Sequence, residues 1–235
     1  NPNFDLSYLN CHRTPHAKIQ KLSTRAGIAL INSLPYLFSG HLPATGRLRH
    51  RLNIIQQWAS IQDPNPHHYY TPVDDGEGCY NNLSPPKARH HTFALIDMVL
   101  EKTGIKGFFV PTNSSTAPVA PHNTPLHRRP QPCVFIDAST IKKVITWSAN
   151  YRYLQLGELL LQQPPDKGLF QGESLSVLQS QCTLYWDEHT AFTNSNTLRS
   201  SLRITRFVDD KFSLLHVGTP DPTEATTHNP LQLLN

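Results

Sequence analysis

The sequence has few charged residues and no long hydrophobic run. Charged side chains make up 16% of the 235 residues, against about 25% in an average globular domain. No apolar segment approaches the roughly 20 residues that a membrane-spanning helix requires. The chain also has no C-x-x-C pair and no G-x-G-x-x-G or G-x-x-x-x-G-K-[ST] loop. We therefore expect no membrane-spanning segment, no paired-cysteine zinc or redox motif and none of the usual nucleotide loops.

Proline, by contrast, is abundant. Twenty prolines are too many for a mostly helical bundle, because proline lacks the backbone N–H and fixes φ. Many of them fall between periodic segments, where they mark loops. The sequence therefore predicts an α+β protein, in which a helix-rich N-terminal half packs on a largely antiparallel C-terminal sheet and the connections are long, proline-rich loops.

The N-terminal half has three segments of helical periodicity. Apolar residues recur at three- and four-residue steps over 16–38, 47–61 and 87–103, and Gly104 is a natural end for the third helix. Residues 105–110 follow as a short buried strand.

The C-terminal half is richer in strand patterns. We predict strands at 133–137, 177–186, 198–208 and 211–217. Asp209-Asp210 indicates a tight turn between the last two. Residues 151–163 favour a helix, and residues 140–147 fit either a strand or a helix.

Residues 111–131 have a composition typical of a linker or a long surface loop. Five prolines stand there among Ser, Thr, Asn and Ala. We interpret 1–235 as a single domain, since neither half alone has a rich apolar core. Any subdivision would fall near 111–131, between a helical part (16–110) and a strand-rich part (132–218).

The segment from His67 to His91 concentrates reactive side chains in a sparsely charged chain. It holds four histidines, three carboxylates and a cysteine, which are groups that bind metals or transfer protons. The candidate ligands for zinc or another divalent metal are His67, His68, Asp74, His90 and His91. Their spacing matches no standard metal-binding pattern, and the alternative is an exposed polar loop.

The same segment suggests nucleophilic catalysis. Residues 76–80 (Gly-Glu-Gly-Cys-Tyr) place Cys79 between a glycine-rich turn and an aromatic residue. This resembles the nucleophile segment of papain-like and viral leader cysteine peptidases and of OTU-type deubiquitinases. The resemblance implies a thiolate at Cys79. A distant histidine, His216 or His189, would then be the base, with Asp75 as a further candidate. In those enzymes the cysteine begins a long helix, whereas Pro85 follows Cys79 by six residues here. The alternatives are a disulfide or an unreactive loop thiol for Cys79 and a half-buried strand histidine for His216.

The charge balance permits an anionic partner. The net charge is +4 with all thirteen histidines neutral, and two short basic runs stand at 47–51 and 127–129. The candidate binding residues are Arg47, Arg49, Arg51, Tyr69 and Tyr70. The alternative for the basic runs is a solvated helix face and a solvated loop.

Cysteine content leaves the compartment open. Four cysteines allow two disulfides or four thiols, so the sequence fits a secreted or a cytoplasmic protein. Three function classes follow. The first is a hydrolase or transferase that uses the His/Asp/Cys loop. The second is a secreted or effector-like module that recognises a protein or glycan. The third is a weak nucleic-acid binder that uses Arg47, Arg49, Arg51, Arg128 and Arg129.

Overall fold

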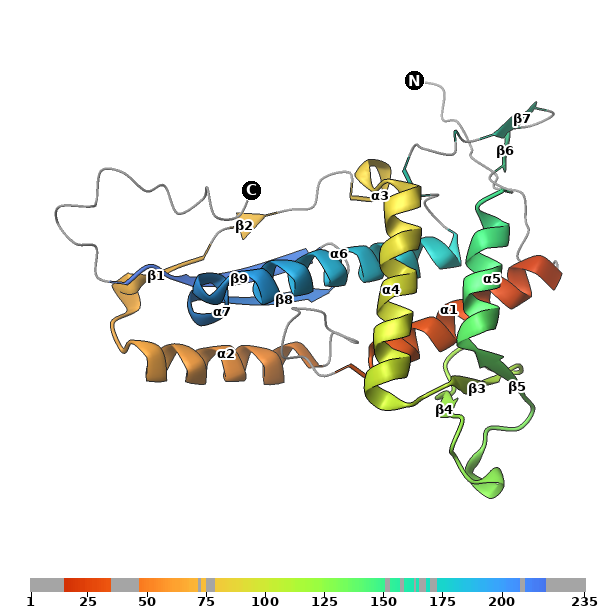
Figure 1. The fold of residues 1–235 in the computed structure, drawn as a ribbon, viewed down its shortest axis with the longest axis horizontal. Helices are drawn as coiled ribbons and strands as arrows, with labels where there is room; N and C mark the ends of the chain where they lie inside the picture. The colour runs from red at the N-terminus through yellow and green to blue at the C-terminus, as the bar shows by residue number, and fades with distance from the viewer. Residues whose placement is uncertain are drawn as a thin grey trace. The chain divides into compact units, whose positions relative to one another are not determined.

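The chain folds into two compact units. The computed structural model describes residues 15–34, 47–71, 73–74, 79–150, 153–156, 159–162, 164, 168–169, 173–207 and 210–218 (Figure 1). Unit 1 comprises Asn1–Pro35 and Gly78–Trp186, and unit 2 comprises Tyr36–Glu77 and Asp187–Asn235. Each unit is therefore assembled from two separate stretches of the sequence.

Helices form most of unit 1. They are α1 (Pro15–Ile31), α3 (Cys79–Asn82), α4 (Pro85–Thr103), α5 (Ala138–Ser148) and the first part of α6 (Ser174–Asn194). Helix α1 packs against α4, α5 and the first strand of the unit's sheet. Among the described residues these helices share one large apolar core, whose fully buried members include Leu30, Leu95, Ile96, Ile141 and Leu178.

A three-stranded antiparallel sheet completes that core. Its order is β4-β3-β5, with β3 at Gly107–Pro111, β4 at Ala120–Pro121 and β5 at Cys133–Asp137. Successive side chains of a strand point to opposite faces. Phe108 and its partner Ile136 therefore enter the core, while the neighbouring pair Phe109 and Phe135 lies on the outer face. A separate hairpin pairs β6 (Tyr153–Leu156) with β7 (Leu159–Gln162).

Unit 2 is built around one central strand. Its elements are α2 (Leu48–Gln62), η4 (Pro66–His68), β1 (Tyr69–Tyr70), β2 (Val73–Asp74), α7 (Asn196–Ser201), β8 (Leu202–Phe207) and β9 (Asp210–His216). Strand β9 pairs with β8 over its length and with the short strands β1 and β2 as well, always antiparallel. Among the described residues the apolar core of this unit is small and consists of Phe192, Leu202, Ile204 and Leu215.

The α+β class with antiparallel strands is confirmed. Helices α1, α2 and α4 fall on the three predicted helices, although residues 35–38 of the first lie outside the described residues. Strands β3, β5, β8 and β9 fall on predicted strands. Residues 140–147, for which a strand or a helix was possible, lie in the helix α5. The turn residue Asp209 is outside the described part, and Asp210 begins β9.

Three element predictions are wrong. Residues 198–201, predicted as the start of a strand, belong to α7. Residues 177–186 belong to α6 rather than to a strand. Helix α6 is buried on nearly all sides over residues 175–185, so this part of the sequence shows no amphipathic helical period. Two of its buried hydroxyls bond within the helix: Ser180 Oγ donates to the Val177 carbonyl at 3.0 Å and Thr183 Oγ1 to that of Gln179 at 2.7 Å. Residues 151–163 contain the β6–β7 hairpin rather than a helix.

Residues 111–131 lie inside unit 1 between two paired strands, and an arginine orders their first half. The Arg25 guanidinium donates to the carbonyls of Pro111 and Ser114, both at 2.9 Å, and of Ala117 at 2.6 Å. Burial lowers the pKa of Arg25, and the three carbonyls compensate for the desolvation.

The single-domain interpretation stays a prediction. No helix within the described residues is long and apolar enough to cross a membrane.

Candidate functional site

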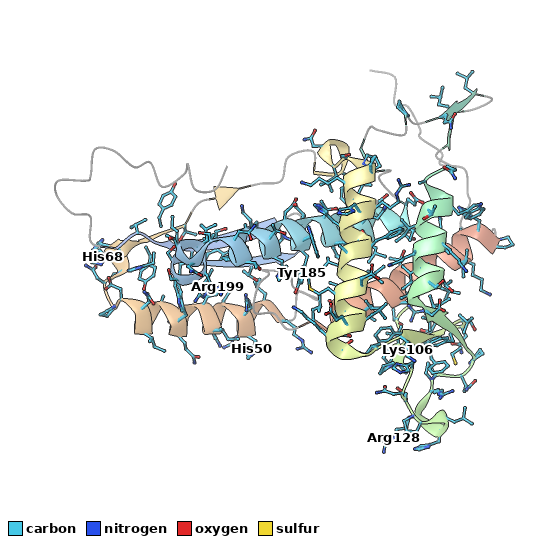
Figure 2. All side chains as sticks on the ribbon, viewed as in Figure 1. His50, His68, Lys106, Arg128, Tyr185 and Arg199 are labelled. Carbon is cyan, nitrogen blue, oxygen red and sulfur yellow. The ribbon has the colours of Figure 1, made fainter. Side chains whose placement is uncertain are left out.

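Helix α2 presents an exposed basic end. Arg47 at the N-cap and Arg49 and His50 in the first turn are exposed, and Ile55 is the one buried residue of this helix. The helix contains no carboxylate. Figure 2 labels His50 on α2. Exposed cations without neighbouring carboxylates on their own helix are available to an anionic ligand.

Arg51 has a different role from its neighbours. It is half-buried, and its Nη2 donates to the Ile204 carbonyl of β8 at 3.3 Å. Arg203 of β8 lies over the ring of Trp58 with its guanidinium carbon 4.1 Å from the ring centre, a cation–π contact. Burial lowers the pKa of Arg203, and the nearby Arg51 lowers it further. These two arginines therefore attach α2 to β8.

A carboxylate holds two imidazoles at the end of α2. His68 Nδ1 lies 2.5 Å from Asp63 Oδ2, and His216 Nε2 lies 3.3 Å from the same oxygen. Since a carboxylate can only accept hydrogen bonds, His68 Nδ1 and His216 Nε2 each carry a hydrogen. Asn65 Nδ2 then donates to His68 Nε2 at 3.0 Å. The hydrogen bond from His68, followed by that from the Asn65 N–H, lowers the pKa of Asp63 to about 2.

Of the two tyrosines of β1, one is bonded within the fold and the other is exposed, as for the arginines of α2. The Tyr69 hydroxyl reaches the carbonyls of Ala59 at 2.6 Å and Asp63 at 3.0 Å. Its ring packs between Trp58 and His216. Tyr70 is 43% exposed. Tyr69 therefore supports the C-terminal end of α2, and Tyr70 is the one of the pair that is open to a ligand.

Of the three catalytic candidates, the structure describes the side chain of His216 alone. Cys79 begins the single-turn helix α3 in unit 1, and its side chain lies outside the described part. Asp75 also lies outside it. His216 belongs to unit 2, where its imidazole contacts Asp63. A thiolate–imidazole pair at Cys79 stays a prediction.

The predicted metal ligands are distributed over both units. His67 and His68 lie in η4 and Asp74 in β2, with the Asp74 side chain outside the described residues. His90 and His91 lie in α4. His91 is buried, and its ring centre lies 6.0 Å from that of Trp186. Within the described ranges no group of three or more His, Cys, Asp or Glu is arranged to hold a metal ion. Cys133 and Cys182, whose side chains are described, are thiols.

The second basic run lies beside the outer face of the unit 1 sheet. His127 and Arg128 are exposed in η5 (Leu126–Arg128). Arg129 follows, and its guanidinium carbon lies 4.0 Å from the ring centre of Phe109. Figure 2 labels Arg128 and Lys106 in this part of unit 1.

One signal in the sequence was missed. No Asp or Glu occurs from residue 6 to residue 62, a stretch with seven Lys and Arg, and none occurs from 102 to 136, a stretch with four. The first stretch contains α1 and α2, and the second contains β3, β4 and η5. Counting missing carboxylates would have marked both basic surfaces more clearly than the short runs of arginine do.

Comparison with known proteins finds similarity of fold alone. No protein-family model matches the sequence, and no curated protein sequence matches it. The chain is similar to telomerase from Candida albicans, in a structure with a TWJ fragment of telomeric RNA, at a TM-score of 0.54 and 15% identity over 89% of this chain. It is also similar to apo telomerase from Candida tropicalis truncated from its C-terminal domain, at a TM-score of 0.53 and 13% identity over 95% of this chain. The match covers 31% of the first telomerase chain and 39% of the second, so this chain spans about a third of their length.

Proposed function

We propose that the chain binds RNA and forms an RNA-binding part of a telomerase-like protein. The exposed, carboxylate-free basic end of α2 is the observation that carries the proposal. The fold similarity supports it, because one of the telomerase structures holds a fragment of telomeric RNA. The weak nucleic-acid binder foreseen from the sequence is thereby the function class that the geometry favours.

Arg47 and Arg49 are the residues assigned to the phosphates. Both are exposed at the start of α2, and neither has a carboxylate on its own helix. The N-terminal end of a helix adds partial positive charge to theirs. Phosphate contacts set the position of a nucleic acid and give binding its salt dependence. Arg51 and Arg203 are not assigned to the phosphates, because they hold α2 against β8.

The test measures binding of the full chain to a labelled RNA stem–loop at several salt concentrations. We expect Arg47→Gln and Arg49→Gln each to lower the slope of log affinity against log salt by about 1. Lys143→Gln is the matched control, because Lys143 is exposed but lies near the carboxylate of Asp137. The slope should not change in that variant.

Two outcomes would contradict the proposal. One is an absence of stem–loop binding by the unmodified chain at low salt. The other is a slope that stays the same in both arginine variants. A DNA duplex of equal length, measured in parallel, separates preference for RNA from attraction to any polyanion.

A further inference from the structure

We propose that the outer face of the β4-β3-β5 sheet in unit 1 is a second contact for RNA and takes unpaired bases by stacking. The proposal rests on the proposed function in that its ligand is a nucleic acid. It adds a separate site and a preference for single-stranded segments. The surface consists of Phe109, Phe135 and Arg129 and is called the aromatic platform below.

Backbone register places the two aromatic rings next to each other. Phe109 of β3 is the direct partner of Phe135 of β5, with ring centres 5.1 Å apart and ring planes at 47°. Phe135 is 42% exposed, although a phenylalanine on an open sheet face gains nothing from contact with water. The exposed Phe135 and the half-buried Phe109 beside it therefore form an aromatic surface that a partner can cover.

Gly107 lets the Phe135 ring lie close to the sheet. A Cβ atom at Gly107 would lie 2.9 Å from the tip of the Phe135 ring and 2.5 Å from the Ile136 carbonyl oxygen. The absence of a side chain at Gly107 thus allows the tip of the Phe135 ring to lie over β3. Flat, fixed aromatic faces are what single-stranded nucleic-acid binders use to stack bases.

Arg129 extends the platform by a second plane. Its guanidinium carbon lies 4.0 Å from the Phe109 ring centre, and its Nε donates to the Thr124 carbonyl at 2.8 Å. The hydrogen bond fixes the guanidinium over the ring. Proteins that bind single-stranded RNA stack bases on arginine planes as well as on aromatic rings.

The surrounding charge suits a phosphate backbone. No Asp or Glu occurs from residue 102 to 136, while Lys106, His127 and Arg128 are exposed in this stretch. The carboxylate that follows, Asp137, is engaged as the N-cap of α5 and accepts the Thr140 N–H at 2.6 Å. Charge complementarity therefore selects a nucleic-acid strand over an apolar protein segment as the occupant.

The experiment compares three labelled probes on the full chain. They are a ten-nucleotide oligouridine, an abasic oligomer with the same number of phosphates and an RNA duplex. We expect Phe135→Ala to weaken oligouridine binding about tenfold and to leave binding of the abasic oligomer unchanged. Phe135→Tyr, which keeps the ring, should retain the affinity. Arg129→Lys, which keeps the charge but not the plane, should cause a smaller loss.

Trp147→Ala is the matched control. Trp147 is an aromatic residue of unit 1 with the same 42% exposure as Phe135, but it lies on α5. Its loss should leave oligouridine binding unchanged. Equal affinity of Phe135→Ala and the unmodified chain for oligouridine would overturn the platform, and so would an equal loss on the abasic oligomer. If stem–loop binding through α2 persists in either case, the proposed function stands while the aromatic platform falls.

Discussion

Each of the two units is stabilised internally by a different kind of contact. Unit 1 has one large core of apolar side chains from its helices and its sheet, whereas the core found in the described part of unit 2 has four such residues. Unit 2 compensates with polar contacts. Arg206 Nε donates to Glu188 at 2.8 Å, and Asp63 accepts from two imidazoles. Apolar burial depends weakly on pH, while ion pairs and hydrogen-bonded carboxylates depend on it strongly, so the two units should respond to different perturbations.

Arginine shows the same contrast at the level of single residues. Arg25 and Arg51 donate hydrogen bonds to backbone carbonyls, and the Arg203 guanidinium lies over a tryptophan ring. Arg47 and Arg49 are exposed on α2. A count of basic residues does not separate these two groups, but the structure does. The proposed RNA contact rests on the second group, because its side chains are exposed and the first group's side chains support the fold.

The largest expected effect comes from the ion pair of unit 2. The Arg206 side chain is 2% exposed and that of Glu188 13%. Glu188→Ala would leave a buried guanidinium without this carboxylate, which we expect to cost about 4 kcal/mol. Amide hydrogen exchange should then accelerate in β8 and β9 and remain slow in α4. Glu188→Gln keeps an acceptor oxygen and should cost less.

Unchanged exchange in β8 and β9 of the Glu188→Ala protein would show that the small apolar core is enough to hold unit 2. Faster exchange in α4 to the same extent would show that the units unfold together. Either result would remove the contrast between a polar and an apolar unit.

The second prediction addresses the core of unit 1. Leu95 of α4 is fully buried among apolar side chains. Leu95→Ala should cost about 3 kcal/mol, because it leaves a cavity that the surrounding helices only partly fill. Hydrogen exchange should accelerate in α1, α4 and α5, with β8 and β9 unaffected. A matched control is Leu126→Ala, at a residue that is 70% exposed, and this variant should change nothing.

Sequence patterns predicted the elements whose burial is one-sided. Helices α1 and α4 carry an apolar stripe, and Gly104 after α4 adopts the left-handed conformation, with φ at 67°. Strands β8 and β9 surround a turn signal. In contrast, α6 buries Ser180 and Thr183 as well as leucines, so its periodicity is hidden. The leucine-rich 151–163 segment has the composition of a helix, but Gly157 interrupts its apolar run and glycine is unfavourable inside a helix.

The site was harder to predict than the fold. Arg47, Arg49 and Arg51 form one basic run in the sequence, yet helical geometry turns Arg51 toward β8 and leaves the other two exposed. The pairing of His216 with Asp63 joins residues 153 positions apart. Such contacts depend on which segments share a unit, and local patterns contain no information on that.

The smallest expected effect sharpens the contrast through pH. The pKa of Asp63 falls from 3.8 to about 2 in the folded chain. A carboxyl with a depressed pKa stabilises the fold above its unfolded pKa, so this contribution is complete above about pH 4 and is lost as the pH falls toward 2. Asp63 is 22% exposed, and solvent screening keeps the effect modest. Hydrogen exchange in β1 and β9 should accelerate over this pH window, and Asp63→Asn should remove the acceleration. The Asp137 carboxyl of unit 1, whose pKa its hydrogen bonds to Thr140 lower, provides the comparison. Asp137→Asn should alter acid sensitivity at α5 and leave that of β1 and β9 unchanged. If Asp63→Asn and the unmodified chain lose protection in β9 at the same pH, the imidazole–carboxylate contacts do not hold unit 2, and its stability must come from β8–β9 pairing instead.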